Sequence, residues 1–126
     1  MEPTPHNSIL IVEDEVAHLS LLQTTFEGAG YRVFAAKDGI AAKDLYARHE
    51  KEIDVVLCDM ALPELGGWTV YQALKEINPR VKVVLTSGYL DAKVKSLFVS
   101  GGVKDFLVKP YEPETILKSV RDALAN

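Results

Sequence analysis

The stretch SILIVED, residues 8–14, decides the fold of this 126-residue chain, because an apolar, β-branched run ends there in two acidic residues. Two later runs end in a similar way, VVLCD at residues 55–59 and FLVK at residues 106–109. If these runs are parallel strands of one sheet, their last residues gather at its carboxyl edge, where open α/β sheets place ligand sites. The charged residues that end the runs are therefore expected to lie together: Glu13, Asp14, Asp59 and Lys109.

Three carboxylates held this close need a cation beside them. Two like charges 4 Å apart repel each other by about 4 kcal/mol at an effective dielectric constant of about 20. Lys109 and a divalent metal would balance this repulsion, and carboxylate oxygens are ligands that Mg²⁺ prefers. Glu13 and Asp14 have an alternative role, because acidic residues also stabilise the positive N-terminal end of a following helix.

The composition indicates one folded domain. Hydrophobic residues make up 48% of the chain and charged residues 25%, unlike the composition of disordered proteins. The net charge of −4 argues against a large basic surface for nucleic acid or an anionic membrane. We expect a tail at residues 1–7, a single domain over residues 8–126 and, without a signal peptide or membrane span, a cytoplasmic location. Cys58 lies inside an apolar run and is expected to pack in the core.

Short β-branched runs alternate with stretches of helical period, the pattern of a parallel sheet covered by helices on both faces. Strands, each buried on both faces, are expected near residues 8–13, 31–36, 54–59, 81–87 and 105–109. Helices are expected at residues 15–27, after Asp38, after Gly66-Gly67 until Asn78-Pro79, near residues 91–100 and after Pro113. Because crossovers between parallel strands are right-handed, this order favours an α/β, doubly wound, flavodoxin-like sheet of five strands in the order 2-1-3-4-5 with five helices.

Asp59 ends the most central of these strands. A carboxylate placed there can act as a nucleophile toward phosphorus or as a metal ligand, whereas the alternative is an ordinary turn residue. The alternative interpretation of Lys109 is a solvated lysine on the protein surface. Ser87 or Thr86 can offer a hydroxyl to a phosphoryl oxygen, but successive strand side chains point to opposite faces, so only one of the two can serve.

The residues Glu13-Asp14, Asp59, Pro63, Gly67, Ser87-Gly88 and Lys109-Pro110, in this order and at these spacings, resemble the receiver domain of two-component response regulators. The resemblance implies that Asp59 accepts a phosphoryl group from a histidine kinase or a histidine phosphotransfer domain. It implies Mg²⁺, with Mn²⁺ as an alternative, bound by Asp14, Asp59 and the backbone carbonyl of Ala61, with Glu13 assisting. Lys109 would pair with the phosphoryl group, Ser87 would be the hydroxyl of the switch and Phe106 the aromatic residue behind it.

A receiver domain of this kind is regulatory rather than an enzyme, limited to self-phosphorylation from a phosphodonor and slow autodephosphorylation. Phosphorylation would switch the face formed by the helix near residues 91–100, the strand at 105–109 and the helix after Pro113. The expected partners are the kinase or phosphotransfer domain and a downstream protein or covalently linked output domain, without direct nucleic acid or membrane contact. The chain would be a monomer or a phosphorylation-dependent dimer. Ala61 and Tyr89, at positions that tune dephosphorylation in the family, predict a phosphoryl group lasting minutes or longer.

Two other functions remain open from the residues alone. One is a Mg²⁺-dependent phosphohydrolase with Asp59 as nucleophile, although such enzymes commonly need a second acid where this chain has Ala61. The other is a receiver-like interaction module that no longer uses phosphate, against which the acids and Lys109 count. His6, His18 and His49 show no metal-ligand spacing and are expected to be surface residues.

Overall fold

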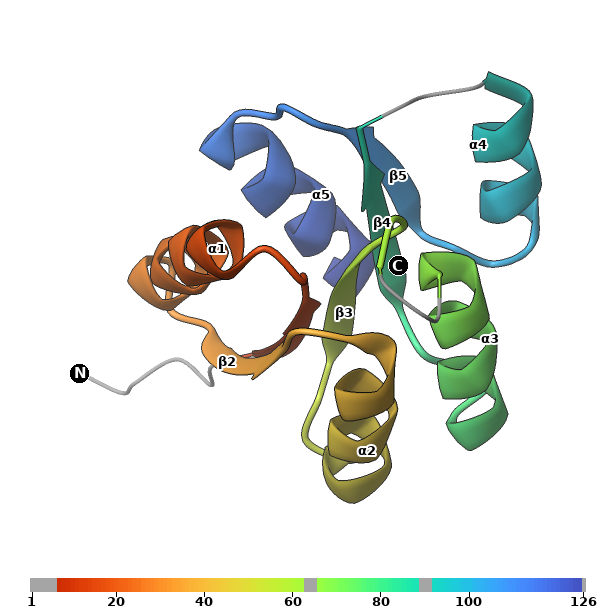
Figure 1. Ribbon diagram of the computed structural model, residues 1–126, viewed down its shortest axis with the longest axis horizontal. Helices are drawn as coiled ribbons and strands as arrows, with labels where there is room; N and C mark the ends of the chain where they lie inside the picture. Colours follow the sequence, from red (N-terminus) through yellow and green to blue (C-terminus); the bar gives the residue numbers. More distant parts are fainter. Residues whose placement is uncertain (1–6, 63–65, 89–91, 126) are drawn as a thin grey trace.

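The computed structural model describes residues 7–62, 66–88 and 92–125, in which strands and helices alternate along the chain. The strands are β1 (Ser8–Val12), β2 (Arg32–Ala36), β3 (Val55–Asp59), β4 (Val83–Ser87) and β5 (Asp105–Val108). The helices are α1 (Val16–Gly28), α2 (Gly39–His49), α3 (Gly67–Ile77), α4 (Ala92–Ser100) and α5 (Pro113–Ala125). All neighbouring strands pair in parallel in the order β2-β1-β3-β4-β5, which confirms the predicted fold (Figure 1).

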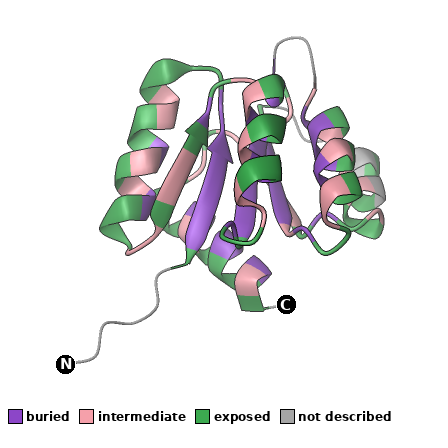
Figure 2. Ribbon diagram, turned by 90° about the horizontal axis from the view of Figure 1, so that it is seen from below, coloured by how far each residue is buried: buried purple, intermediate pink, exposed green. Residues whose placement is uncertain are grey.

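The alternation of side chains along the strands builds two cores, one on each face of the sheet. Leu10, Val56 and Leu85 point to the face covered by α2, α3 and α4, where they pack with the helix residues Tyr46 and Leu74. The intervening strand residues, such as Ile11, Leu57 and Val84, point to the face covered by α1 and α5. Helices therefore shield the central strands from both sides (Figure 2).

The prediction that every strand is buried on both faces is wrong for the two edge strands. β1 and β3 are buried along their whole length, whereas Arg32 and Ala35 of β2 are exposed and β5 is mostly half-buried. β2 and β5 each have a strand neighbour on one side only, so water reaches them from the other. The central position of β3 is what buries its last residue, Asp59.

Local signals mark the helix ends. The side chain of Asp38 accepts a hydrogen bond from the N–H of Ala41 at 2.7 Å, so Asp38 is the predicted N-cap of α2. Gly30 has a φ of 95° in the turn after α1, a conformation that favours glycine. Pro113 is the first residue of α5 rather than the residue before it, because the first helical N–H needs no partner within the helix.

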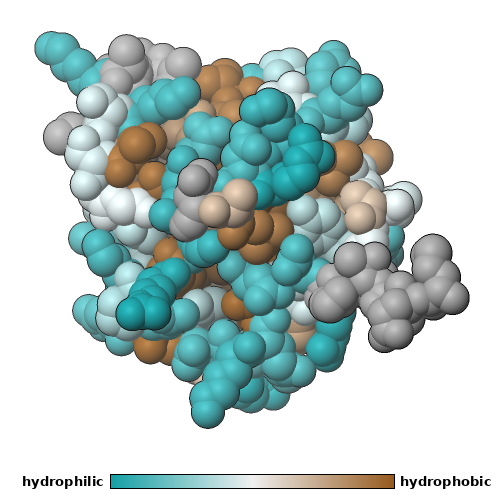
Figure 3. Space-filling view, turned by 180° about the vertical axis from the view of Figure 1, so that it is seen from behind, coloured by the Kyte–Doolittle hydropathy of each residue, from teal (hydrophilic) through white to brown (hydrophobic). Residues whose placement is uncertain are grey.

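The surface is mixed in character. Among the described residues, the large apolar side chains that stay exposed are Val16, Leu21, Ile40 and Val99. The face shown in Figure 3 carries its hydrophobic residues as separate small patches between hydrophilic ones. None of the helices in the described part of the chain has the length and apolar character needed to cross a bilayer.

Candidate functional site

Three acids meet at the carboxyl edge of the sheet, as the sequence predicts. Glu13 and Asp14 follow β1, and Asp59 is the last residue of the neighbouring strand β3. One carboxylate oxygen from each lies within 4.8 Å of those from the other two. Glu13 and Asp59 are buried, with 2% and 5% of their surface exposed, while Asp14 is open to solvent.

Lys109 reaches this cluster from the residue after β5. Its Nζ donates a hydrogen bond to Glu13 Oε1 at 2.8 Å and to Asp59 Oδ2 at 3.2 Å. Burial lowers the pKa of Lys109, but the hydrogen bonds and negative charges of Glu13 and Asp59 outweigh burial and raise this pKa above its ordinary value. The half-buried ammonium group is therefore charged and bound to two acids, and is not the solvated surface lysine of the alternative reading. The peptide bond between Lys109 and Pro110 is cis.

Backbone N–H groups hold the remaining oxygens of the buried acids. Asp59 Oδ1 accepts a hydrogen bond from the N–H of Ala61 at 3.2 Å, and Glu13 Oε2 accepts one from the N–H of Glu15 at 3.1 Å. Cys58, beside Asp59, is buried in the core as predicted, and burial raises the pKa of its thiol far above the usual range. The hydrogen bonds from the N–H of Ala61 and from Lys109 give the side chain of Asp59 a defined orientation at the end of its strand.

The donor set fits a hard divalent cation. Three carboxylates supply oxygen ligands, and the one ammonium group of Lys109 balances only part of their negative charge. A cation such as Mg²⁺ or Mn²⁺ takes oxygen ligands of this kind and usually keeps several waters. Asp14, Asp59 and Glu13 are the side chains that would hold it.

Ser87 and Thr86 end on different faces of β4. Thr86 lies opposite Asp59 in the strand register and is buried, and it shares its face with Val84, which packs toward α1 and α5. Ser87 is half-buried and shares the opposite face with Leu85. Leu85 lies opposite Phe106 on β5, so Ser87 and Phe106 lie on the same side of the sheet.

Phe106 points inward, with 3% of its surface exposed. Its ring lies 5.8 Å from that of Phe98 on α4, and Phe98 stacks on Trp68 of α3 at 4.5 Å between ring centroids. The predicted aromatic position is thus filled by a ring packed between β5 and α4. Pro63 and Tyr89, which belong to the sequence motifs, lie outside the described residues.

His18 is the residue that sequence reasoning missed. It was expected at the surface, but its side chain is only 21% exposed, and its Nδ1 lies 2.9 Å from Glu13 Oε1. Its Nε2 lies 3.4 Å from the hydroxyl oxygen of Tyr111. The available signal was its place one helical turn after Asp14, on a helix that starts at the acid cluster. His49 lies at the end of α2 and pairs with Glu52, and His6 lies outside the described residues.

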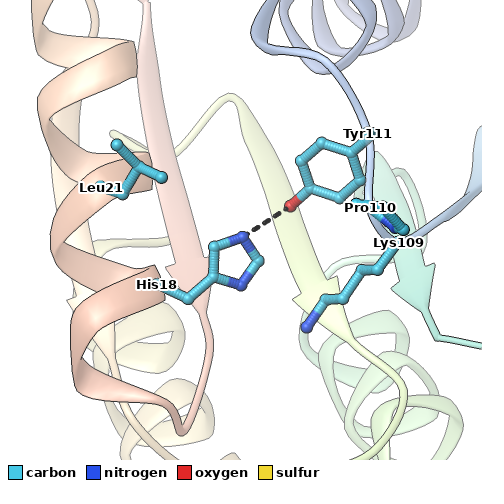
Figure 4. Close-up of a pocket in the computed structure, with 5 residues that line it drawn as sticks. All are labelled: His18, Leu21, Lys109, Pro110 and Tyr111. Carbon is cyan, nitrogen blue, oxygen red and sulfur yellow. Dashed lines mark hydrogen bonds between the residues drawn. The ribbon is translucent and has the colours of Figure 1, made fainter.

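A surface pocket of about 460 Å³ opens beside this cluster (Figure 4). His18 and Leu21 line it from α1, and the segment after β5 lines it from the other side with Lys109, Pro110 and Tyr111. The dashed contact in Figure 4 joins His18 to Tyr111 across the gap between the two segments. Lys109 therefore contributes both to this pocket and to the acid cluster.

Comparison with known proteins matches residues 9–121 to the response regulator receiver domain. The transcriptional regulatory protein ZraR of Klebsiella oxytoca is 34% identical over 120 residues, which cover 94% of this chain and 26% of that protein. The aerobic respiration control protein ArcA of Escherichia coli K12 is 33% identical over 123 residues, covering 98% of this chain and 50% of that protein. The chain thus spans about a quarter to a half of the length of these relatives.

Solved structures agree with this match. A response regulator receiver domain protein from Clostridium thermocellum superposes with a TM-score of 0.89 at 25% identity, covering 94% of both chains. A chain of the CheX–CheY–BeF₃–Mg²⁺ complex from Borrelia burgdorferi superposes with a TM-score of 0.90 at 26% identity, covering 95% of this chain and 90% of that one. This chain belongs to the response regulator receiver domains, the phospho-acceptor signalling domains of two-component systems.

Proposed function

We propose that Asp59 is the phosphoacceptor of this receiver domain. A carboxylate oxygen of Asp59 would attack the phosphorus of a phosphohistidine on a histidine kinase or a histidine phosphotransfer domain. A P–O bond forms, the P–N bond breaks, and its electron pair returns to the histidine nitrogen. The observation that carries the proposal is the placement of Asp59, which is buried at the end of the central strand between Lys109 and two further acids.

The neighbours of Asp59 suit this transfer, which depends more on positioning and charge neutralisation than on covalent chemistry from other side chains. The N–H of Ala61 orients one oxygen of Asp59, and Lys109 contacts the other. Lys109 is also the charged donor that would pair with the oxygens of the transferred group. It would then exchange its present contact with Asp59 for one with the phosphoryl group.

Asp14, Asp59 and the backbone carbonyl of Ala61 would hold Mg²⁺, or Mn²⁺ in its place, with Glu13 assisting. When bound, the metal would neutralise charge on the phosphoryl oxygens. The support is the chemistry of the donors, with three carboxylates in reach of one another and a single ammonium group among them. The Borrelia complex, a close match in fold, is described with Mg²⁺ and BeF₃.

Phosphorylation would be transmitted through Ser87 and Phe106 to the face formed by α4, β5 and α5. The Ser87 hydroxyl would move toward the phosphoryl group, and Phe106 would follow on the same side of the sheet. Phe106 is buried against Phe98 of α4, so a change in its position would alter the packing of that helix. An acyl phosphate supplies the added charge and acceptor oxygens that bias such a two-state surface.

The output would be binding of a downstream protein or control of a covalently linked output domain by this face. ZraR is named as a transcriptional regulatory protein, and both ZraR and ArcA are longer than this chain, which supports an output beyond residues 8–126 and a cytoplasmic location. The receiver itself would act as a regulatory domain, with self-phosphorylation and slow autodephosphorylation as its only chemistry. Ala61 offers no side chain to orient an attacking water, so the phosphoryl group is expected to last for minutes or longer.

Intact mass spectrometry after incubation with acetyl phosphate and Mg²⁺ tests this proposal. Wild type is expected to gain about 80 Da, the mass of one phosphoryl group, and to lose it over minutes, whereas Asp59→Asn gains nothing. Asp44→Asn, which changes an exposed acid on α2, is the matched control and should behave as wild type. An equal gain by Asp59→Asn would contradict the assignment. Continuous release of many equivalents of phosphate would favour a phosphohydrolase, and no adduct with any donor would favour a phosphate-independent module.

A further inference from the structure

His18 connects α1, the acid cluster and the segment after β5. Its ring extends from α1 toward Tyr111, beside the side chain of Lys109 (Figure 4). One ring nitrogen lies 2.9 Å from Glu13 Oε1 and the other 3.4 Å from the hydroxyl oxygen of Tyr111. His18 therefore contacts a buried acid of the site and, at the same time, a residue that is 93 positions away in the chain.

The chemistry of Glu13 and Tyr111 indicates which ring nitrogen of His18 carries a hydrogen. An ionised carboxylate only accepts hydrogen bonds, so Nδ1 of His18 carries the hydrogen that it donates to Glu13. In a neutral ring Nε2 is then the acceptor, and the Tyr111 hydroxyl donates to it. Burial raises the pKa of Tyr111, and the charges of Glu13 and Asp59 raise it further, so the hydroxyl keeps its proton. In the neutral ring, the hydroxyl of Tyr111 thus donates to Nε2 of His18, and Nδ1 of His18 donates to Glu13.

Glu13 depends on these donors because only 3% of its side chain is exposed. Oε1 accepts from both Lys109 and His18, and Oε2 accepts from the N–H of Glu15. Lys109 is shared with Asp59 and, in the proposed function, is drawn to the phosphoryl group. His18 is then the side-chain donor that still holds Glu13.

We propose that His18 is a positioning residue, which holds the carboxylate of Glu13 in the acid cluster so that the cluster binds a divalent cation. This inference rests on the metal site of the proposed function. Residues that hydrogen-bond the ligands of a metal commonly change its affinity by about 10–100-fold when they are removed. Loss of the His18 donor is therefore expected to weaken Mg²⁺ binding by about tenfold.

Calorimetric titration of Mg²⁺ into the unphosphorylated chain tests the inference with three variants. His18→Leu removes the donor, whereas His18→Asn keeps an amide N–H near the position of Nδ1. His49→Leu is the matched control, because His49 forms the same kind of pair with Glu52, at 2.6 Å, away from the site. We expect affinity about tenfold weaker in His18→Leu, within about twofold of wild type in His18→Asn, and unchanged in His49→Leu.

The ring nitrogens of His18, observed by ¹⁵N NMR without metal, give a second readout that a general loss of stability would not produce. The Nδ1–H tautomer is expected in wild type, because the carboxylate of Glu13 only accepts hydrogen bonds. An Nε2–H tautomer in wild type would overturn the inference. The inference would also be overturned if wild type binds Mg²⁺ and His18→Leu binds it with an affinity within about twofold of wild type. That result would leave the proposed function intact. A wild type that binds no Mg²⁺ at millimolar concentration would overturn both.

Discussion

Gly67 lies directly against the backbone of Asp59. A β-carbon on residue 67 would come within 2.5 Å of the Asp59 carbonyl oxygen and 2.8 Å of the Cα of Met60. The N–H of Gly67 also donates a hydrogen bond to the carbonyl oxygen of Met60 at 3.0 Å. The start of α3 is thus docked on the strand end that carries the proposed phosphoacceptor, and glycine is the residue that leaves room for this contact.

Replacing Gly67 by alanine should therefore destabilise the fold. Both close neighbours are backbone atoms, which cannot rotate away, so we expect the free energy of unfolding to fall by about 2 kcal/mol. Urea unfolding measures this loss. Gly28→Ala is the matched control, because nothing lies within 4 Å of the added carbon at this helix position, and it should be neutral or stabilising by up to about 1 kcal/mol. Equal stability of Gly67→Ala and wild type would contradict the contact.

Replacing Asp14 by asparagine should remove most of the stabilisation that Mg²⁺ gives to the fold. Asp14 is exposed, so Asp14→Asn should fold normally without metal and be slightly more stable, since one of three like charges is lost. Mg²⁺ at ten times its dissociation constant is expected to stabilise wild type by about 1.4 kcal/mol, and Asp14→Asn far less at the same concentration. Thermal unfolding with Mg²⁺ and with EDTA measures both effects. Asp44→Asn, on α2, should respond to Mg²⁺ as wild type does, and an equal response from Asp14→Asn would remove Asp14 from the ligand set.

The stack between Trp68 and Phe98 should report on the contact between α3 and α4. The rings are nearly parallel, at 12°, and Trp68 is the single tryptophan of the chain. Phe98→Leu is expected to lower the free energy of unfolding by about 1 kcal/mol. It should also shift the fluorescence emission of Trp68 to longer wavelength, because the indole becomes more exposed to water. Phe34→Leu, which alters a half-buried ring beside His49, should leave the emission unchanged. Emission that is the same in Phe98→Leu and wild type would contradict the stack.

Tyr46 should make the fold sensitive to alkaline pH. Burial raises the pKa of Tyr46, against a smaller opposing effect of its hydrogen bond from Asn78. Above about pH 10 the unfolded chain loses the proton of Tyr46 while the folded chain keeps it, so the unfolded state binds fewer protons and stability falls as pH rises toward the folded pKa. Between pH 9 and pH 11, wild type should lose up to about 1.4 kcal/mol more than Tyr46→Phe in urea unfolding. Equal losses of unfolding free energy in wild type and Tyr46→Phe would show that Tyr46 ionises equally in the folded and unfolded states.

Local pattern in the sequence was sufficient for the order of the elements and for the acids of the site. The three central strands, β1, β3 and β4, are apolar runs rich in β-branched residues. Signals such as Asp38 before α2 and Asn78-Pro79 after α3 act within a few residues of the backbone that they shape. Parallel pairing then obliges the strands to end at one edge, so the meeting of Asp14 with Asp59 follows from strand order alone. The roles of these residues in phosphoryl transfer stay predictions.

Tertiary structure decided the burial of the edge strands and the surroundings of Glu13. Whether a β-branched run is covered on both sides depends on its place in the sheet, which left Arg32 of β2 in contact with water. His18 and Tyr111 each look ordinary in their own segment, and no local period relates a residue on α1 to one that is 93 positions away. Their contact exists because α1 and the connection from β5 to α5 pass each other on the same face of the sheet, and packing of these segments sets that distance.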